Sequence, residues 1–265
     1  MLKFYRVICL FFLVIMCSQM AFATLTTTTD YQSFKCEHYL DYGLPGQADQ
    51  YLCRDGYAVG YSYQYKQPLW VAYELTGKSV TKQIKRDDKF EADEQIPIAY
   101  RAELGDYKKS GYDRGHMAPY ASMDFNQESA DQSFLLSNMS PQVGGLNRQG
   151  WAQLEKYVRF WAKSKEEIWV YTGPIFKGKN QKTIGKNKVA VPSAFYKIIY
   201  APKQNELIAF AMPNKRIRKN QVENYIVPVS QIELRTGLKF LTMLPAEQRD
   251  KLISNTAKMW RTSYK

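Results

Sequence analysis

The chain has 265 residues, with 37 lysine and arginine residues against 25 aspartate and glutamate residues and a formal net charge of +12 at pH 7. This length is enough for one sizeable hydrophobic core, and the positive charge indicates a polyanionic partner: nucleic acid, an anionic membrane surface or acidic glycans. No stretch after residue 23 is long and apolar enough to span a bilayer, which excludes membrane-spanning helices beyond that point.

The N-terminal segment has the pattern of a secretory signal peptide. Lys3 and Arg6 precede the apolar run VICLFFLVIMC, and the small residues AFA at 21–23 are suited to cleavage. We therefore expect residues 1–23 to be removed and residues 24–265 to form one domain, periplasmic or secreted, without membrane attachment. Cleavage leaves 35 basic and 25 acidic residues, a net charge of +10. An uncleaved anchor helix is the alternative interpretation.

Two cysteines, Cys36 and Cys53, remain after that cleavage. A pair of cysteines in an exported chain most simply forms one disulfide. We expect this bridge to be structural, because neither cysteine has the surroundings of a nucleophile. The rest of the segment 24–60 is polar and rich in turn residues, which predicts a loop that wraps the core.

Strands and helices are interspersed in the predicted order of elements. Strands are predicted at 69–76, at 167–176 with an end at Gly173-Pro174, and in a hairpin of 194–202 and 206–213. Helices are predicted at 126–138, 150–164 and 245–260. There is no regular alternation of strand and helix and no glycine-rich phosphate turn, so the fold class is α+β.

Two segments concentrate positive charge. Residues 177–188 contain five lysines and no acid, and residues 214–220 contain four basic residues. Two solvated loops would explain this composition. Two such segments after strands of one basic protein favour a groove that follows a phosphate backbone, and the candidate nucleic-acid-binding residues are Lys177, Lys179, Lys182, Lys215, Arg216 and Arg218.

The stretch YDRGHMAP contains one of only two histidines in the chain, His116. A lone histidine is usually structural, but here Arg114 lies two residues before it and Gly115 permits close approach of a ligand. Guanidinium binds phosphate oxygens through a bidentate fork, and imidazole can take a proton from water near neutral pH. The neighbouring positive charge favours the neutral imidazole, so activity should decline below pH about 6.5.

A metal site is indicated downstream, in SNMSPQVGGLNRQGWAQLE. Asn138 and Asn147 offer amide oxygens, and Glu155 offers a carboxylate at the start of an apolar-striped helix. One direct protein ligand with water held by a carboxylate suits Mg²⁺, which keeps several of its waters. Alternatively, Asn138 caps a turn and Glu155 pairs with a surface lysine.

These motifs together resemble those of the DNA/RNA non-specific endonuclease family. DRGHMAP, SNMSPQ and LNRQGWAQLE occur in the family's order and spacing, and the likeness extends from about residue 70 to about residue 240. The resemblance implies the ββα-metal nuclease fold, with a central, mainly antiparallel sheet flanked by helices. It also implies hydrolysis of DNA and RNA with little sequence preference, leaving 5′-phosphate ends.

The resemblance assigns a role to each matching residue. His116 is similar to the general base, Asn147 to the sole direct protein ligand of Mg²⁺, and Glu155 to the carboxylate that holds a metal-bound water. Arg114 and Arg86 resemble arginines that contact phosphate and stabilise the transition state. Asn138 is similar to a second polar supporter of the site, and Mn²⁺ is expected to substitute for Mg²⁺.

Two other functions are compatible with parts of the pattern. A catalytically idle protein that binds nucleic acid or other polyanions would use the basic segments. Binding alone does not require His116, Asn147 and Glu155, and their presence together argues against this function. A zinc-dependent nuclease needs further histidine or cysteine ligands, which the chain lacks after His116. The sequence leaves open the oligomeric state and the existence of an inhibitor or immunity protein.

Overall fold

The computed structural model describes residues 36–81, 84–178 and 180–263. The predicted signal peptide, residues 1–23, lies outside these ranges. Among the residues described, no helix is long and apolar enough to cross a membrane.

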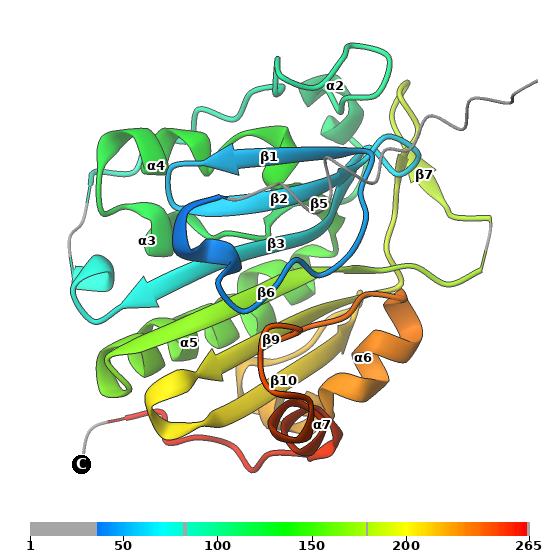
Figure 1. The fold of residues 1–265 in the computed structure, drawn as a ribbon. Helices are drawn as coiled ribbons and strands as arrows, with labels where there is room; N and C mark the ends of the chain where they lie inside the picture. The colour runs from blue at the N-terminus through cyan, green and yellow to red at the C-terminus, as the bar shows by residue number, and fades with distance from the viewer. Residues whose placement is uncertain (1–35, 82–83, 179, 264–265) are drawn as a thin grey trace, which may run out of the picture. The chain divides into compact units, whose positions relative to one another are not determined.

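Six strands form one sheet in which all neighbours are antiparallel (Figure 1). In spatial order they are β1 (Gln50–Arg54), β2 (Tyr57–Ser62), β3 (Gln67–Thr76), β6 (Glu167–Ile175), β9 (Ala194–Ala201) and β10 (Glu206–Pro213). Two short hairpins lie outside this sheet: β4 (Asp113–His116) with β5 (Met139–Gln142), and β7 (Thr183–Ile184) with β8 (Val189–Ala190).

The helices are mostly short. The α-helices are α2 (Leu104–Tyr107), α3 (Tyr120–Met123), α4 (Gln127–Gln132), α5 (Ala152–Ser164), α6 (Val229–Thr236) and α7 (Ala246–Ser254). The 3-10 helices are η1 (Glu37–Leu40), η2 (Ser79–Thr81), η3 (Leu136–Asn138), η5 (Pro202–Gln204) and η6 (Lys219–Tyr225), and a π-helical turn, η4 (Leu146–Trp151), precedes α5. The predicted α+β class, with helices flanking a mainly antiparallel sheet, is confirmed.

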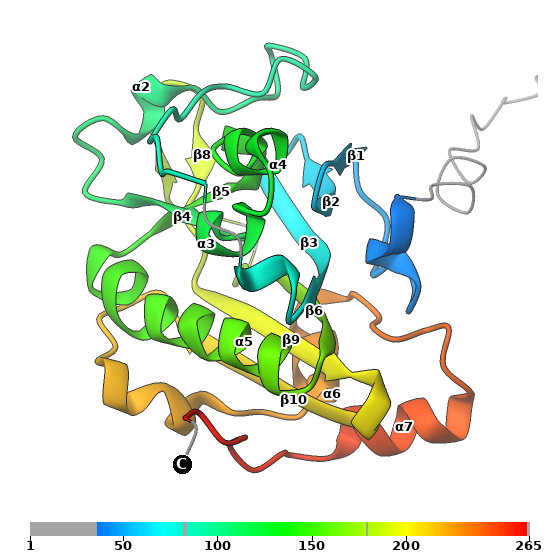
Figure 2. The ribbon, with the colours of Figure 1, turned by 90° about the vertical axis from the view of Figure 1, so that its left-hand side faces the viewer.

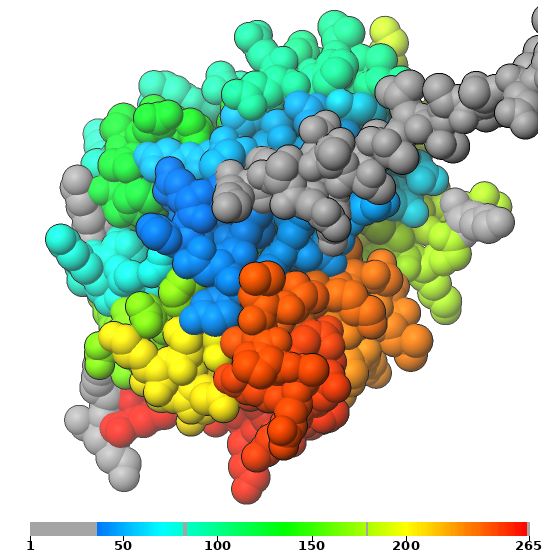
Figure 3. All heavy atoms as spheres, viewed as in Figure 1, coloured from blue at the N-terminus to red at the C-terminus, as the bar shows by residue number. Residues whose placement is uncertain are grey.

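The sheet buries both of its faces because side chains alternate along each strand. Val71 and Tyr73 of β3 pack into the core that contains α5, while Trp70 and Ala72 pack into the core that contains α6. In Figure 2, α5 lies on one side of the sheet and α6 and α7 lie towards the other. Figure 3 shows the α6–α7 segment, in orange and red, beside the N-terminal residues in blue.

The helix α5 begins within the predicted range because its apolar residues recur at helical spacing. Leu154, Val158 and Trp161 are fully buried against the sheet. The residues before Ala152 form the π-helical turn instead of a regular helix. The packing of these buried residues against the sheet fixes the position of Glu155, which directly follows Leu154.

Several predicted elements have different limits in the structure. The strand β6 continues through Gly173 and Pro174, because both pair with β9. The predicted helix 126–138 ends at Gln132, and the predicted helix 245–260 ends at Ser254. The expected wrapping loop of residues 24–60 is wrong for its last part, where β1 and β2 form a hairpin around Asp55-Gly56, and Gly56 has φ +109°.

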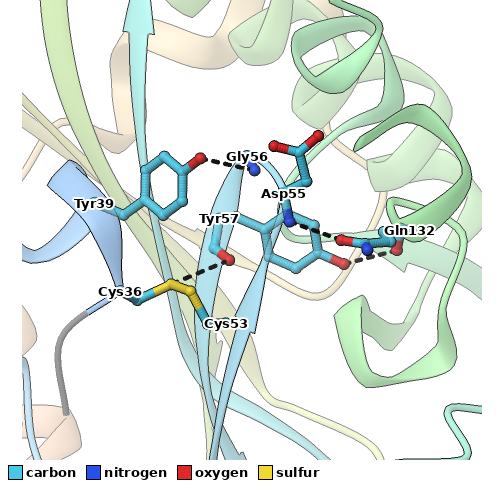
Figure 4. Close-up of a disulfide and its surroundings, with 7 residues drawn as sticks. All are labelled: Cys36, Tyr39, Cys53, Asp55, Gly56, Tyr57 and Gln132. Carbon is cyan, nitrogen blue, oxygen red and sulfur yellow. Dashed lines mark hydrogen bonds between the residues drawn. A yellow bond between two sulfur atoms is a disulfide. The ribbon is translucent and has the colours of Figure 1, made fainter. Parts of the chain in front are cut away.

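The predicted disulfide joins Cys36, just before η1, to Cys53 of β1 (Figure 4). Beside it, the Gly56 amide donates to the Tyr39 hydroxyl at 2.8 Å, and the Tyr57 hydroxyl donates to the Gln132 carbonyl at 2.7 Å. The bridge therefore fastens the N-terminal segment to the first hairpin, which is tied in turn to α4.

Candidate active site

Five of the predicted site residues line one cavity of about 690 Å³: Arg86, Arg114, His116, Asn147 and Glu155. They come from a loop, from β4, from the π-helical turn and from α5. The remaining lining residues are Phe90, Leu104, Tyr107, Lys108, Tyr112, Asp113, Arg148 and Ala152. Folding thus brings a residue near position 86 to residues near 115 and 150, as the resemblance requires.

His116 is held by backbone contacts and by aromatic rings. The Trp151 indole donates to the His116 carbonyl at 3.3 Å, and the imidazole lies 5.6 Å from the ring of Phe90 and 5.4 Å from that of Phe134. Its Nε2 is buried and has no hydrogen-bond partner among the described residues. Burial first, and then the Arg86 guanidinium, lowers the pKa of His116 to about 3, with a smaller effect from Arg114.

The predicted direction of that shift is therefore right, but its main cause is burial and not the neighbouring charge. The expected decline of activity below pH 6.5 no longer follows for this group, because its pKa lies well below that value.

The side chain of Asn147 is oriented by Asp113. Its Nδ2 donates to Asp113 Oδ2 at 2.9 Å, and Arg148 Nε donates to the same oxygen at 2.8 Å. An ionised carboxylate only accepts, so the nitrogen of Asn147 must face Asp113 and its oxygen must face elsewhere. Burial raises the pKa of Asp113, but the hydrogen bonds from Arg148 and Asn147 outweigh it and hold the pKa below its ordinary value.

The π-helical turn around Asn147 is packed against the segment 214–218. The Ile217 amide donates to Gly145 at 3.2 Å, and the Gly150 amide donates to Ile217 at 3.0 Å. A Cβ at Gly150 would lie 2.7 Å from the Ile217 side chain, so glycine permits this close approach. The turn is thereby fixed from outside the cavity.

Two arginines of the cavity rest on aromatic rings. The Arg114 guanidinium lies 3.9 Å from the centroid of Phe90, and that of Arg86 lies 5.3 Å from Tyr120. Arg86 Nε also donates to Asp88 at 2.7 Å, in a pair that is more than half exposed. Neither arginine has a buried carboxylate partner among the described residues, so both remain available to an anionic ligand.

Glu155 projects from the first turn of α5 into the cavity and is partly buried. Burial raises the pKa of Glu155, while the charges of Lys197, Arg159 and Arg86 and a hydrogen bond with Trp151 lower it. No group of three or more histidine, cysteine, aspartate or glutamate residues suited to a metal occurs in the part of the chain that the structure describes.

Asn138, the predicted second polar supporter of the site, does not line the cavity. Its side chain is fully buried, its Oδ1 accepts from the Ala118 amide at 2.9 Å, and its Nδ2 donates to the carbonyls of Ala118 and Ser133 at 2.8 Å. Two of these three hydrogen bonds hold the backbone at Ala118, just after His116, and the third holds the Ser133 carbonyl at the end of α4. Asn138 therefore supports the site by shaping the loop after His116.

The first basic segment adjoins the cavity wall. Asn187 donates to both carboxylate oxygens of Asp106, in α2, at 2.9 Å, and Lys182 Nζ lies 5.2 Å from the ring of Tyr112, which lines the cavity. Lys177 and Lys182 are exposed, and Lys179 lies outside the described residues. In the second segment, Lys215, Arg216 and Arg218 are exposed but do not line the cavity.

Sequence reasoning assigned no role to Tyr107, Lys108, Tyr112 and Arg148, which also line the cavity. Lys108 and Tyr112 lie shortly before the DRGH motif, and Arg148 directly follows Asn147. Their proximity to the motifs was a usable signal. Lys197 was also missed, because it lies in a strand whose other residues are apolar or aromatic.

Comparison with known proteins identifies relatives along most of the chain. The family of DNA/RNA non-specific endonucleases matches residues 38–247. Nuclease 1, mitochondrial, of Schizosaccharomyces pombe is 35% identical over 241 residues, covering 83% of this chain and 75% of the relative. Nuclease C1 of Cunninghamella echinulata var. echinulata is 37% identical over 236 residues, covering 83% and 94%.

Endonuclease G, mitochondrial, of Homo sapiens is 36% identical over 214 residues, covering 76% of this chain and 72% of the relative. A solved structure of an EndoG/EndoGI complex, concerned with the mechanism of EndoG inhibition, is similar with a TM-score of 0.75 and 35% identity. That match covers 80% of this chain and 93% of the other.

These relatives contradict the expectation of a periplasmic or secreted protein. The proteins from Schizosaccharomyces pombe and Homo sapiens are both named as mitochondrial. A short apolar run behind Lys3 and Arg6 is therefore insufficient to identify an export signal, because apolar and basic N-terminal residues also occur in segments that direct proteins elsewhere.

The structural match also confirms the expected ββα-metal fold, in which β4 and β5 precede α5. Because the family match spans most of the chain and the relatives are endonucleases, this protein is an endonuclease that belongs to the DNA/RNA non-specific endonuclease family.

Proposed function

We propose that this protein is a Mg²⁺-dependent endonuclease that hydrolyses the phosphodiester bonds of DNA and RNA with little sequence preference and leaves 5′-phosphate ends. The observation that carries the proposal is a single cavity containing a neutral imidazole, an amide oxygen, a carboxylate and three guanidinium groups. These are the parts that phosphodiester hydrolysis needs: a base for water, cations for phosphate and ligands for a metal.

His116 takes the proton from the attacking water. Since Nε2 is buried without a partner, Nδ1 is the ring nitrogen left to receive this proton. The water oxygen forms a bond to phosphorus, the bond to the 3′ oxygen breaks, and that oxygen takes a proton from solvent water and leaves as a hydroxyl. The products are a 5′-phosphate and a 3′-hydroxyl.

Arg114 and Arg86 bind the non-bridging phosphate oxygens. Their guanidinium groups are planar forks that match phosphate, and their stacking on Phe90 and Tyr120 sets their orientation before the substrate arrives. As charge develops on the phosphate oxygens, these groups stabilise it without further reorganisation.

The residues present fit a hydrated Mg²⁺. Asn147 would hold the ion through Oδ1, which Asp113 turns away from itself and which has no donor among the described residues. Glu155 would accept hydrogen bonds from the ion's waters. When bound, the ion supplies positive charge that stabilises the pentavalent phosphate and the leaving oxygen.

The breadth of substrate is supported by the kinds of groups around the cavity. The basic residues and tyrosines there are suited to phosphate contacts and stacking, neither of which reads sequence. The family is described by action on both DNA and RNA.

The proposal is tested with supercoiled plasmid and single-stranded RNA incubated with the protein and Mg²⁺. We expect both to be cut, EDTA to stop the cleavage, and added Mg²⁺ or Mn²⁺ to restore it. Nicks in the plasmid should be sealed by DNA ligase, which requires a 5′-phosphate beside a 3′-hydroxyl. Undiminished cleavage in EDTA, or nicks that cannot be sealed, would show the mechanism to be wrong.

A further inference from the structure

Lys197 is a charged residue in the interior of the protein. It lies in β9, between Thr172 of β6 and Phe210 of β10, and its side chain is 0% exposed. It points to the α5 side of the sheet, as its alternating neighbours Phe195 and Ile199 do. Burial of an ammonium group costs several kcal/mol unless the charge is compensated, so this position needs an explanation.

The neutral contacts of this ammonium are weak. Lys197 Nζ donates to the Tyr73 hydroxyl at 3.3 Å and to the Met117 carbonyl at 3.4 Å, and it lies 4.7 Å from the Trp151 ring centroid. Among the described residues no carboxylate forms a hydrogen bond with it. Two long hydrogen bonds and a cation–π contact do not replace the hydration of an ammonium group.

Two of these contacts lead directly to the active site. Met117 follows His116, so the bond from Lys197 holds the peptide next to the catalytic imidazole. Trp151, which lies under the ammonium, donates its indole hydrogen to the His116 carbonyl at 3.3 Å. Lys197 and Trp151 therefore hold consecutive carbonyl groups of one loop.

The missing opposite charge is that of Glu155. Burial lowers the pKa of Lys197, and the Glu155 carboxylate is the group that opposes this effect. Conversely, Lys197 is foremost among the cations that lower the pKa of Glu155. Glu155 lies four residues after Trp151, about one helical turn along α5, so both charged residues lie near the same indole.

We propose that Lys197 is a positioning residue for phosphodiester hydrolysis: its buried ammonium compensates the Glu155 carboxylate and anchors the carbonyl that follows His116. This inference rests on the proposed roles of His116 and Glu155. A purely structural lysine would stabilise the fold without any energetic connection to Glu155.

The first test is a stability cycle in the full chain with Lys197→Met, Glu155→Gln and the double variant. Methionine keeps the length of the side chain and removes its charge. Each single variant leaves one charge without its opposite charge and should lower the Tm, whereas the double variant should have a higher Tm than Lys197→Met alone. If the double variant is no more stable than Lys197→Met, the two residues are not partners and the proposal is wrong.

The second test is kinetic. Lys197→Met should lower kcat ~10–100-fold, the usual scale for losing a supporting partner of a metal site, with little change in KM. Because both changes disable the same carboxylate, the double variant should be no more than ~3-fold slower than Glu155→Gln. A folded Lys197→Met protein with the parent's kcat, or losses that multiply in the double variant, would overturn the proposal.

Lys203→Met is the matched control, because Lys203 follows the same strand but is exposed and pairs with Glu166. It should keep the parent's kcat. Failure of the parent itself to cut nucleic acid would instead reject the proposed function, and the stability cycle would still report on the pair.

Discussion

Single residues of this site owe their chemistry to their surroundings. His116 is neutral because aromatic rings and guanidinium groups surround it. The side-chain oxygen of Asn147 is available to a ligand because Asp113 accepts a hydrogen bond from the side-chain nitrogen. The lowered pKa of the imidazole and the orientation of the amide therefore come from neighbouring residues and not from the residue types themselves. Changes at this scale should therefore alter the rate or the metal affinity while leaving the fold in place.

Replacement of His116 by alanine should lower turnover at least ~10²-fold and leave binding of nucleic acid nearly intact, since only the proton acceptor is lost. Because burial lowers the pKa of His116 to about 3, its imidazole should stay neutral as the pH falls from 8 to 5. NMR of the imidazole resonances, with His116 assigned from its loss in the alanine variant, checks this. A resonance that titrates near pH 6.5 would contradict it.

Asn147→Ala and Glu155→Gln should differ in their response to Mg²⁺. The alanine variant loses the proposed direct ligand, so metal affinity and rate should both collapse. The glutamine variant keeps its size but loses the charge that orders water, so its rate should fall ~10–100-fold. Cleavage rates measured against Mg²⁺ concentration should show partial rescue for Glu155→Gln and hardly any for Asn147→Ala. Saturation of Asn147→Ala at the parent's concentration and rate would place the metal elsewhere.

At the scale of elements, short irregular segments carry most of the site, and regular elements hold them in place. The π-helical turn that presents Asn147 is bonded to the segment around Ile217, and the β7–β8 hairpin is bonded to α2 through Asp106. The first basic segment, which overlaps this hairpin, is therefore joined to a wall of the cavity, which supports its predicted contact with the substrate backbone.

Replacement of Lys177, Lys179 and Lys182 by glutamine should weaken binding of all sequences alike. The dependence of log affinity on log salt should become less steep by up to ~0.9 for each lost phosphate contact. Fluorescence anisotropy with labelled duplexes of different sequence at several salt concentrations measures both effects.

The charge-matched control replaces Lys203, Lys239 and Lys251 by glutamine, since these lysines lie outside both basic segments. Equal loss of affinity in the two triple variants would mean that only net charge matters, and the first basic segment would have no specific role.

At the scale of the whole molecule, the antiparallel sheet separates two cores, and the disulfide fastens the N-terminal segment to one edge of it. The bridge spans 17 residues, and none of these residues lines the cavity. Stability and activity should therefore be separable here.

The variant with Cys36 and Cys53 both changed to serine should lose ~3 kcal/mol of unfolding free energy, the scale expected for closing a loop of this length. Below its lowered Tm it should cleave at the parent's rate. Thermal unfolding and plasmid cleavage of both proteins, with a reduced sample of the parent as control, test this. An unchanged Tm would mean that the bridge contributes no stability.

The sequence by itself determined the family, the endonuclease activity that goes with it and the elements with strong local patterns. The DRGH motif, Asn147 and Glu155 were recognisable because their order and spacing are preserved along the chain, and α5 and the β9–β10 hairpin followed from apolar periodicity. The N-terminal segment, by contrast, led to the wrong compartment, because composition alone identifies a targeting route poorly.

Only the tertiary structure decided which of these groups face one another. In the folded chain the Asn138 side chain forms its hydrogen bonds with the backbone, and the Lys197 side chain is buried next to the site. It also paired β1 with β2 where a loop was expected. The physical reason is that burial, pKa and hydrogen-bond partners depend on contacts between residues far apart in the chain, such as Lys197 with Met117 and Trp151, whereas motifs and periodicity report only local order.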